Sequence, residues 1–255
     1  MIDKLRKQTL PYTCDLIDAK INNKNLYSLT EPKNYLTRAT YYRLFVPNVV
    51  NDKKALLLDS DLVVNGSIKE LYEIDISNYL IGAVESIGGD HYKDLGLKQK
   101  ADYFNAGVML INLELWRKHN LTDKVINYML SYPKNIRFAD QCGLNAIVNG
   151  NWKRVPAKYN LTTSLFRDPE RFYIDGEELK EARLNPIIIH YTGPSKPWQF
   201  KNKHPYKRLY WQYLKMTPFF SVIPEKITLK GSLSFVIPKR AIELLRSVKR
   251  SLKRR

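Results

Sequence analysis

The sequence predicts an α/β fold in which helices flank a mixed, mainly parallel β-sheet. Three short apolar runs, at residues 55–58, 80–84 and 187–189, show no alternation of polar and apolar side chains. Continuous apolar runs are typical of strands that are covered on both faces, as in parallel sheets. Helical patterns separate these runs, for example over residues 115–132, and such an alternation is expected of an α/β protein.

The elements before the first apolar run are expected to be a helix, a strand and a second helix. Residues 2–10 have the pattern of a helix end that Pro11 terminates, because proline lacks a backbone donor. Residues 12–18 are predicted to form a strand. Residues 35–46 are aromatic and amphipathic, which predicts a helix that Pro47 ends.

The strand at residues 54–58 leads directly into two carboxylates, Asp59 and Asp61. Residues two apart in an extended chain point to the same side, so the two carboxylates would repel each other. A divalent cation between them would offset both the repulsion and the desolvation. The alternative is an ordinary turn after the strand, with both aspartates solvated.

The middle of the chain is expected to hold a short helix at 68–72 and a mobile, polar, Gly-rich loop at 86–102. A dense apolar strand follows over residues 103–113. It opens with Asn105-Ala106-Gly107, and small residues are typical of a backbone that passes close to another group.

The second half is predicted to begin with the helix at 115–132, followed by a helix that Asp140 and Gln141 open and that runs to Val148. As an alternative to a functional role, Asp140 is a plausible N-cap of this helix. Residues 151–185 are expected to be short strands and loops. The strand at 186–190 ends on His190, and a tight Gly/Pro loop follows it.

Polar side chains therefore follow several predicted strands, at the edge where open α/β sheets bind ligands. Two Asp oxygens and one His nitrogen suit a fairly hard octahedral divalent ion such as Mn²⁺. Gly193 lets the backbone approach an anion, and Lys196 adds a positive charge for phosphate. This combination is what the metal-assisted departure of a diphosphate requires.

Five pieces of the sequence carry a resemblance to a known family. In chain order they are Thr-Tyr-Tyr-Arg-Leu at 40–44, Leu-Asp-Ser-Asp-Leu at 58–62, Tyr-Phe-Asn-Ala-Gly-Val at 103–108, Asp140-Gln141, and His-Tyr-Thr-Gly-Pro-Ser-Lys-Pro-Trp at 190–198. The set resembles the family 8 retaining glycosyltransferases, which have a GT-A fold, and covers roughly residues 10 to 215. The likeness is strongest to bacterial lipooligosaccharide or lipopolysaccharide α-galactosyl- and α-glucosyltransferases.

The resemblance implies transfer of galactose or glucose from a UDP-hexose to a lipid-linked or lipooligosaccharide acceptor, with retention of the anomeric configuration. It implies that Asp59, Asp61 and His190 bind Mn²⁺, with Mg²⁺ as the alternative ion. It implies a catalytic role for Gln141, beneath the anomeric carbon, and for Asp140. The residues implied to bind the donor are Arg43, Ser60, Asn105, Ala106, Gly193 and Lys196.

Other interpretations of single residues stay open at this point. Arg43 could be a helix-surface residue or part of a structural salt bridge, and Asn105 could be a turn residue. His190 could be an isolated core histidine, although Gly193 and Lys196 follow it closely.

The N-terminus departs from the family pattern, in which a first strand carries a short acidic motif for the uracil and ribose. We expect that strand to be missing here, which would leave a gap in the sheet and remove base recognition. Two explanations are a start site annotated downstream of the true one and a truncated remnant. The alternative function is accordingly an inactive remnant that binds membrane or metal-diphosphate without transferring sugar.

The net charge of +17 favours a polyanionic partner, and much of it lies in the C-terminal tail. Residues 239–255 hold eight basic residues against one acid, and apolar residues at 241, 244, 245, 248 and 252 share one helical face. We therefore predict a glycosyltransferase domain at 1–220 and a basic segment at 221–255 that lies on anionic lipid. A solvated tail is the alternative, and no nucleic acid is expected, because no recognition module is evident.

Compartment signals in the sequence are consistent with that prediction. Two cysteines cannot form a disulfide framework, which fits a reducing compartment. Neither a signal peptide nor an apolar stretch of membrane-spanning length is visible. The expected location is cytoplasmic, peripheral on the inner face of the cytoplasmic membrane.

Overall fold

A computed structural model describes residue 21, residue 29, residues 37–199 and residues 202–220. The chain divides into two compact units, residues 1–196 and residues 197–255. The elements predicted at 2–10 and 12–18 and the basic helix predicted at 239–255 lie outside the described residues. The boundary at residue 220 and the lipid-binding segment therefore stay predictions.

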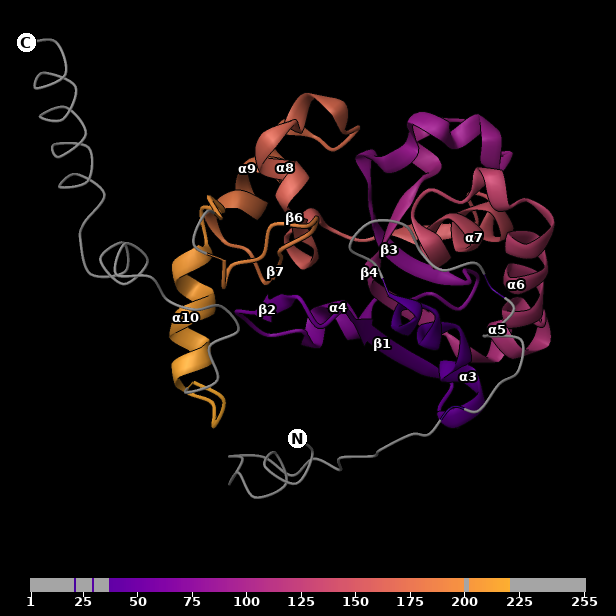
Figure 1. The fold of residues 1–255 in the computed structure, drawn as a ribbon, viewed down its shortest axis with the longest axis horizontal. Helices are drawn as coiled ribbons and strands as arrows, with labels where there is room; N and C mark the ends of the chain where they lie inside the picture. Colours follow the sequence, from indigo (N-terminus) through magenta and orange to yellow (C-terminus); the bar gives the residue numbers. More distant parts are fainter. Residues whose placement is uncertain (1–20, 22–28, 30–36, 200–201, 221–255) are drawn as a thin grey trace, which may run out of the picture. The chain divides into compact units, whose positions relative to one another are not determined.

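The first unit contains two small sheets, drawn in Figure 1. One has the strand order β1-β4-β3-β5 and the other the order β2-β7-β6. The strands are β1 Lys54–Leu58, β2 Leu62–Val64, β3 Ile81–Glu85, β4 Phe104–Asn112, β5 Trp152–Arg154, β6 Leu161–Thr162 and β7 Ile188–His190.

The predicted α/β class is confirmed, but parallel pairing does not dominate among the described strands. Strand β4 lies antiparallel between β1 and β3, and β2 is antiparallel to β7. Of the strand pairs in the described part of the chain, only β3–β5 and β6–β7 are parallel. The continuous apolar runs identified strands correctly, yet such runs report coverage of the two faces and carry no information on strand direction. Strand β3 is fully buried, whereas β1 is half-buried.

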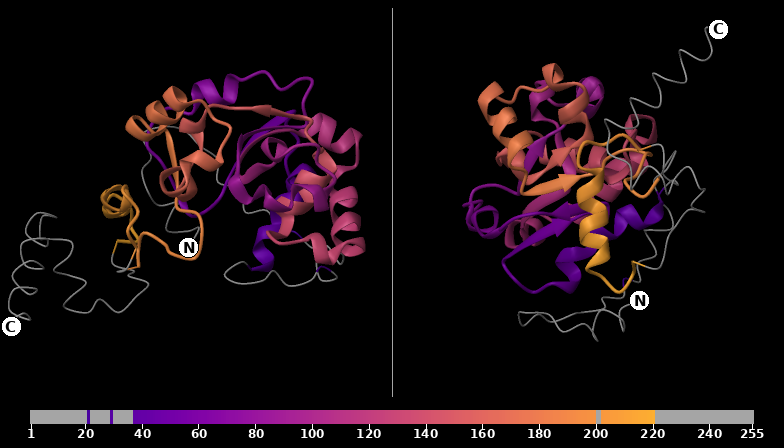
Figure 2. Two further views of the ribbon diagram at one scale, coloured as in Figure 1. Left: turned by 90° about the horizontal axis from the view of Figure 1, so that it is seen from above. Right: turned by 90° about the vertical axis from the view of Figure 1, so that its left-hand side faces the viewer.

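The helices described in the first unit are α3 Val46–Val49, α4 Lys69–Glu73, α5 Leu113–Lys118, α6 Leu121–Ser131, α7 Ala139–Val148, α8 Thr163–Arg167 and α9 Gly176–Leu184. The second unit contains α10 Lys207–Lys215. Helices α5 and α7 contact β4, and α6 packs on α7 (Figure 1). Helix α8 contacts β6, beside the three-stranded sheet (Figure 2). Among the described residues, none of the helices has the length and apolar composition of a membrane span.

Short 3₁₀ turns make most of the other connections. They are η1 Arg38–Phe45, η2 Ile87–Leu95, η3 Lys100–Asp102, η4 Pro133–Asn135, η5 Ala157–Tyr159 and η6 Pro169–Arg171.

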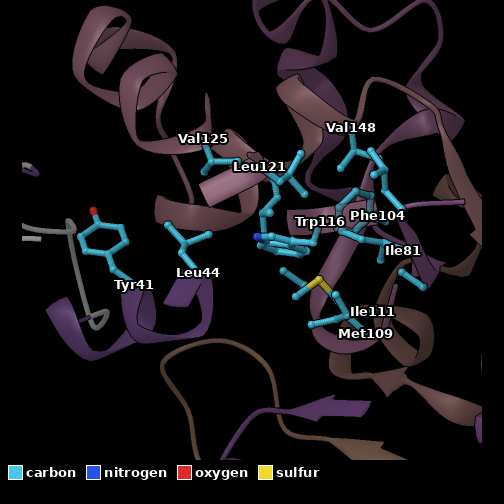
Figure 3. Close-up of a cluster of buried hydrophobic side chains, with 14 of the residues drawn as sticks. Tyr41, Leu44, Ile81, Phe104, Met109, Ile111, Trp116, Leu121, Val125 and Val148 are labelled. Atoms are coloured by element: carbon cyan, nitrogen blue, oxygen red, sulfur yellow. The ribbon is translucent and has the colours of Figure 1, made fainter. Parts of the chain in front are cut away.

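The main core lies between the four-stranded sheet and helices α5 to α7 (Figure 3). Phe104 from β4 and Trp116 from α5 are almost completely buried there. The Trp116 indole donates a hydrogen bond of 3.0 Å to the hydroxyl of Thr122, and that hydroxyl donates one of 2.6 Å to the Leu44 carbonyl. This buried chain connects η1 to α5 and α6, so it helps to place the element that carries Arg43.

Two predicted helices differ from the observed ones near Pro47 and Asn120. Pro47 lies in the first turn of α3 and does not end a helix, because the first turn needs no donor from a proline nitrogen. The helix predicted at 115–132 is two helices, α5 and α6. The break lies at Asn120, whose φ of 49° is left-handed, a conformation that asparagine tolerates better than most residues.

Two predicted loop regions contain more structure than expected. Residues 86–102 were predicted to be a mobile loop, but they form η2 and η3 and bury Leu95 and Leu97 against Tyr103 and Cys142. Two leucines in a polar segment suffice to attach it to the core. Residues 151–185 include α8 and α9, which the prediction of short strands and loops missed.

Candidate active site

Asp59, Asp61 and His190 come together at the point where β1 ends and β2 begins. The pairing of β2 with β7 places Leu62 opposite His190, so the imidazole lies beside the two carboxylates. The Nε2 atom of His190 is 3.1 Å from Asp61 Oδ1 and 3.6 Å from Asp59 Oδ2. One ligand atom from each of the three residues lies within 4.8 Å of the others, which is a geometry that could hold a metal ion.

Gly107 on β4 forms the floor of this cluster. The backbone N–H of Asp59 donates a hydrogen bond of 2.8 Å to the Gly107 carbonyl. A Cβ atom at Gly107 would lie 2.1 Å from Cε1 of His190 and 2.7 Å from Oδ2 of Asp59. No side chain can therefore be accommodated here, because real Cβ contacts are not shorter than about 3 Å.

Asn160 sets the orientation of the His190 ring from the other side. Asn160 is completely buried, and its Oδ1 lies 3.0 Å from Nδ1 of His190. Its Nδ2 donates a hydrogen bond of 2.9 Å to Oδ1 of Asn105, which identifies the atom facing His190 as the acceptor oxygen. His190 Nδ1 therefore carries a proton, and Nε2 is the ring atom that faces Asp59 and Asp61 and that a metal ion would use as its ligand.

Arg43, from η1, connects two of the carboxylates. Its Nη2 donates to Asp59 Oδ1 at 2.6 Å, its Nε lies 2.9 Å from Asp140 Oδ2, and its Nη1 donates to the Ala106 carbonyl at 2.5 Å. Burial alone would lower the pKa of Arg43, but the charges of Asp140 and Asp59 raise it, so the guanidinium stays charged. Arg43 does form salt bridges, as its alternative interpretation states, and they lie within the cluster of predicted site residues.

Asp140 is not the N-cap of α7. The N-cap position is Phe138, and Asp140 lies inside the first helical turn. Its carboxylate is 3% exposed and also accepts a hydrogen bond of 2.5 Å from the hydroxyl of Thr40. Burial raises the pKa of Asp140, and the charge of Arg43 offsets that effect only in part.

Asp61 has the opposite electrostatic character. Burial would raise the pKa of this carboxyl, but hydrogen bonds and charges from His190 and Lys196 outweigh the burial and hold the pKa well below its usual range. The Lys196 ammonium contacts Asp61 Oδ2 directly and donates a hydrogen bond of 2.9 Å to the Tyr191 carbonyl. Asp61 is therefore ionised at neutral pH and available to bind a cation.

Gln141 is held by three hydrogen bonds. Its Oε1 accepts from Asn105 Nδ2 at 3.2 Å and from the backbone N–H of Ala106 at 3.1 Å. Its Nε2 donates to the hydroxyl of Tyr103 at 2.9 Å. Asn105 itself lies within strand β4, so it is not a turn residue.

The remaining two predicted donor-binding residues differ in their settings. Gly193 has a φ of 87°, and nothing lies within 4 Å of where its Cβ would be, so the backbone conformation alone favours glycine there. Ser60 is exposed and does not line the cavity described next, although both of its neighbours, Asp59 and Asp61, do.

Most of the predicted site residues line a single cavity of about 460 Å³ in the first unit. The lining includes nine of the eleven predicted site residues, namely Arg43, Asp59, Asp61, Asn105, Ala106, Asp140, Gln141, His190 and Gly193. Lys196 does not line it but contacts Asp61, which does.

Among the residues to which the sequence-based prediction gave no role, Thr40, Gly107 and Asn160 contact predicted site residues directly. Thr40 and Gly107 carried a signal, because both lie in runs that resemble the family, 40–44 and 103–108. Asn160 carried none, since an isolated asparagine in a predicted loop segment is ordinary.

Comparison with known proteins agrees with the fold. The profile of glycosyl transferase family 8 matches residues 1–202. The chain is 31% identical to general stress protein A of Bacillus subtilis over 228 residues, which cover 86% of this chain and 79% of that protein. It is also 31% identical to lipopolysaccharide 1,3-galactosyltransferase of Salmonella typhimurium, over 82% of this chain and 63% of that enzyme.

Among solved structures, the crystal structure of galactosyltransferase LgtC in complex with donor and acceptor sugar analogues superposes with a TM-score of 0.69. The identity is 22%, and the match covers 78% of this chain and 74% of LgtC, which shows a common fold of the GT-A type. Fold and site thus define a GT-A glycosyltransferase. The chain belongs to glycosyl transferase family 8.

Proposed function

We propose that the protein transfers a hexose, galactose or glucose, from a UDP-hexose to a bacterial lipooligosaccharide or lipopolysaccharide glycan, with retention of configuration. The observation that carries the proposal is the cluster of Asp59, Asp61 and His190 at one cavity with Gln141 and Asp140. The glycan class is supported by the lipopolysaccharide 1,3-galactosyltransferase of Salmonella, of which the chain spans 63%.

The residues present fit a divalent metal ion. Gly107 leaves the space between the ligands open, Asn160 directs the His190 lone pair into it, and two carboxylates supply the negative charge. Oxygen ligands with one imidazole suit Mn²⁺ or Mg²⁺. When bound, the ion would act as a Lewis acid that stabilises the negative charge of the departing UDP.

Lys196 and Gly193 would bind the diphosphate beside the metal ligands. The Lys196 ammonium contacts Asp61, so it lies where it can neutralise charge on a phosphate next to that carboxylate. The left-handed backbone at Gly193 presents main-chain groups without a side chain in the way.

Arg43, Asn105, Ala106 and Asp140 would bind the donor sugar, and Ser60 would contact the donor from the exposed turn. The hydrogen bonds of Gln141 to Asn105, Ala106 and Tyr103 hold its amide still, so it can stabilise positive charge at the anomeric carbon without reorganising. In the transfer the bond from C1 to the UDP oxygen breaks, and the bond from C1 to the acceptor oxygen forms on the same face. The acceptor proton passes to the departing phosphate oxygen.

The basic C-terminal segment would locate the enzyme at the membrane. Residues 239–255 would hold the enzyme on the anionic inner face of the cytoplasmic membrane, where a lipid-linked acceptor is available. Binding to vesicles with and without anionic lipid, compared with a chain ending at residue 238, tests this part.

UDP release from UDP-galactose and UDP-glucose is the experiment that tests the proposed function. We expect slow release that requires Mn²⁺, disappears with a chelator, returns when Mn²⁺ is added back, and is absent in Asp61→Ala. Asp52→Ala is the matched control, because Asp52 is an exposed aspartate near the start of the same strand. If the wild type binds no UDP and releases none, the chain is the inactive alternative and the proposal fails.

The anomeric configuration of the product, read from the proton coupling at C1 in NMR, tests retention separately. An α-linked product from the α-linked donor is expected. A β-linked product would contradict the role given to Gln141.

A further inference from the structure

Three buried polar side chains continue the hydrogen bonding that begins at Gln141. Tyr103 and Cys142 are completely buried, and His91 from η2 is 3% exposed. The Tyr103 hydroxyl lies 2.9 Å from Nε2 of Gln141 and 3.6 Å from Sγ of Cys142. The same sulfur lies 3.3 Å from Nε2 of His91. The proposed function uses Gln141 and its contact with Tyr103, but it gives no part to Cys142 or His91.

The direction of the first hydrogen bond follows from Ala106. Its backbone N–H can only donate, and it lies 3.1 Å from the Gln141 side chain, so the atom that faces it is the amide oxygen. The amide nitrogen of Gln141 therefore faces Tyr103 and donates to its hydroxyl. Turning the amide over would bring two donors together at Ala106 and would place the amide oxygen against Tyr103.

The Tyr103 hydroxyl accepts from Gln141, so its own proton needs an acceptor. Tyr103 is completely buried, and buried donors in proteins are nearly always paired. The acceptor that the structure describes for this proton is Sγ of Cys142. Burial raises the pKa of Tyr103 well above its ordinary value, so the hydroxyl keeps its proton and can donate it.

Cys142 passes the same direction on to His91. Its Sγ also accepts a hydrogen bond of 3.1 Å from the backbone N–H of Phe138. Burial raises the pKa of the Cys142 thiol, so the sulfur keeps its hydrogen. Since Sγ accepts from Tyr103 and Phe138, its S–H is left to donate to Nε2 of His91. His91 Nε2 is therefore the acceptor at the end of the series.

Two aromatic rings hold the His91 imidazole at this end. The ring of Tyr103 meets it edge to face at 5.5 Å between centroids, and the ring of Phe138 lies tilted at 5.8 Å. The donors thus run in one direction, from Gln141 through Tyr103 and Cys142 to His91. We call Tyr103, Cys142 and His91 the relay. Because each member can donate only where the next one accepts, the acceptor at His91 favours a single orientation of the Gln141 amide.

We propose that Cys142 and His91 are positioning residues for sugar transfer, which act on Gln141 through the hydroxyl of Tyr103. They keep the amide oxygen of Gln141 where it can stabilise positive charge at the anomeric carbon. The inference rests on the role that the proposed function gives to Gln141. It extends that role to two residues that need not touch the sugar.

The side-chain amide signals of Gln141 test the relay without requiring turnover. In a ¹H–¹⁵N NMR spectrum of the full-length chain they are the pair that disappears in Gln141→Glu. We expect this pair to differ clearly from the signals of an exposed glutamine such as Gln212. In Cys142→Ala and His91→Phe the pair should move toward the exposed-glutamine positions. Unchanged Gln141 signals in both variants would overturn the proposal.

Conservative variants separate the hydrogen bonds of the relay from its packing. Cys142→Ser keeps a hydroxyl that both donates and accepts, and His91→Gln keeps an acceptor oxygen. Both should hold the Gln141 signals closer to the wild-type positions than Cys142→Ala and His91→Phe do. Backbone signals in the same spectra show whether each variant is folded. If the conservative variants move the Gln141 signals as far as the others, packing accounts for the effect and the relay is refuted.

Steady-state kinetics of UDP release test the positioning role. We expect Cys142→Ala and His91→Phe to lower kcat roughly three- to tenfold, the size of effect that one hydrogen bond has on a rate. The KM for the UDP-hexose and the affinity for UDP should stay within about twofold, because the relay would act on the transition state and not on donor binding. A rise in KM with kcat unchanged would contradict the positioning role.

Tyr159→Phe is the matched control. It removes a hydrogen bond of 2.9 Å from another buried tyrosine, to Glu70, and neither residue lines the cavity. The Gln141 signals and kcat should stay at the wild-type values in this variant. An equal fall in kcat would mean that the loss of any buried hydrogen bond has this effect, which would contradict the proposal.

Failure of the proposed function has a different signature. If the wild type releases no UDP, the transferase function fails and the positioning role falls with it, whatever the NMR spectra show. If the wild type releases UDP but the variants of Cys142 and His91 keep its kcat, only the positioning role is refuted.

Discussion

Gly107 and His190 are in such close contact that a methyl group at residue 107 would displace the imidazole from Asp59 and Asp61, the other two proposed metal ligands. A Cβ atom at residue 107 would lie 2.1 Å from Cε1 of His190. The backbone of β4 is therefore part of the site, and it limits how far the imidazole can withdraw from Asp59 and Asp61.

Gly107→Ala is expected to displace His190 and to weaken Mn²⁺ binding by at least about tenfold, with loss of UDP release. The extra methyl also overpacks a buried position, at a cost of roughly 1–3 kcal/mol in unfolding free energy. Isothermal titration with Mn²⁺ and urea unfolding measure the two effects. The matched control is Gly176→Ala, because nothing lies within 4 Å of a Cβ at Gly176, the first residue of α9. Normal Mn²⁺ affinity in Gly107→Ala would show that His190 is not a ligand.

Asn160 is expected to act on the metal through His190. Asn160→Leu removes the acceptor of the Nδ1 proton and should weaken Mn²⁺ binding roughly 10- to 100-fold, the usual cost of losing a partner behind a metal ligand. Asn160→Asp keeps an acceptor oxygen for the ring, although it loses the donor to Asn105, so it should retain more affinity than Asn160→Leu.

Mn²⁺ titration of the two variants beside Asn151→Leu, at an exposed asparagine, gives the comparison. Equal losses in Asn160→Leu and Asn160→Asp would contradict the tautomer argument and leave Asn160 a packing residue.

Thr122 is expected to matter for stability because its hydroxyl serves two buried partners. In Thr122→Val the Trp116 indole N–H and the Leu44 carbonyl both lose their hydrogen bonds. An unsatisfied buried group costs about 1–3 kcal/mol, so the variant should lose roughly 2–4 kcal/mol in urea unfolding. Thr122→Ser keeps the hydroxyl and should lose clearly less. Equal losses for Val and Ser would mean that the hydroxyl contributes no more to stability than the methyl group does, which would contradict this prediction.

His204 makes the second unit sensitive to mild acid. Burial lowers the pKa of His204 from 6.5 to about 4 in the folded chain, and its Nδ1 accepts a hydrogen bond of 3.2 Å from the Tyr206 N–H. Between pH 6.5 and about 4 the unfolded state therefore binds a proton that the folded state does not, so stability falls as the pH falls. The slope is roughly 1 kcal/mol per pH unit, and above pH 7 the effect is absent.

Hydrogen exchange of the α10 amides at pH 7.5 and pH 5.5, corrected for the intrinsic rates, measures this loss. His204→Gln should remove most of the pH dependence while leaving the exchange at pH 7.5 comparatively little changed. An unaltered pH dependence in that variant would place the acid-sensitive group elsewhere.

The sequence was sufficient to predict the strands that carry the site and most of the residues around it. Asp59 and Asp61 lie two positions apart directly after the apolar run at 55–58, and His190 follows the apolar run at 187–189. The chemistry and the spacing of these three residues were therefore visible without coordinates. The direction of β4 was not visible, because an apolar strand has the same composition in either orientation. The structure of residues 86–102 was also hidden, since two leucines in a polar segment are a weak signal.

What the sequence by itself determined is therefore local: which residues form buried strands, which of them end on metal-ligand side chains, and that these pieces occur in the order of one family. The tertiary structure decided every relationship between distant residues. The distance from Arg43 to Asp140, the contact of Gly107 with His190 and the hydrogen bond from His190 to Asn160 all depend on how β4, α7 and β7 pack. The physical reason is that side-chain chemistry is set by the residue, whereas proximity is set by packing that many residues determine together.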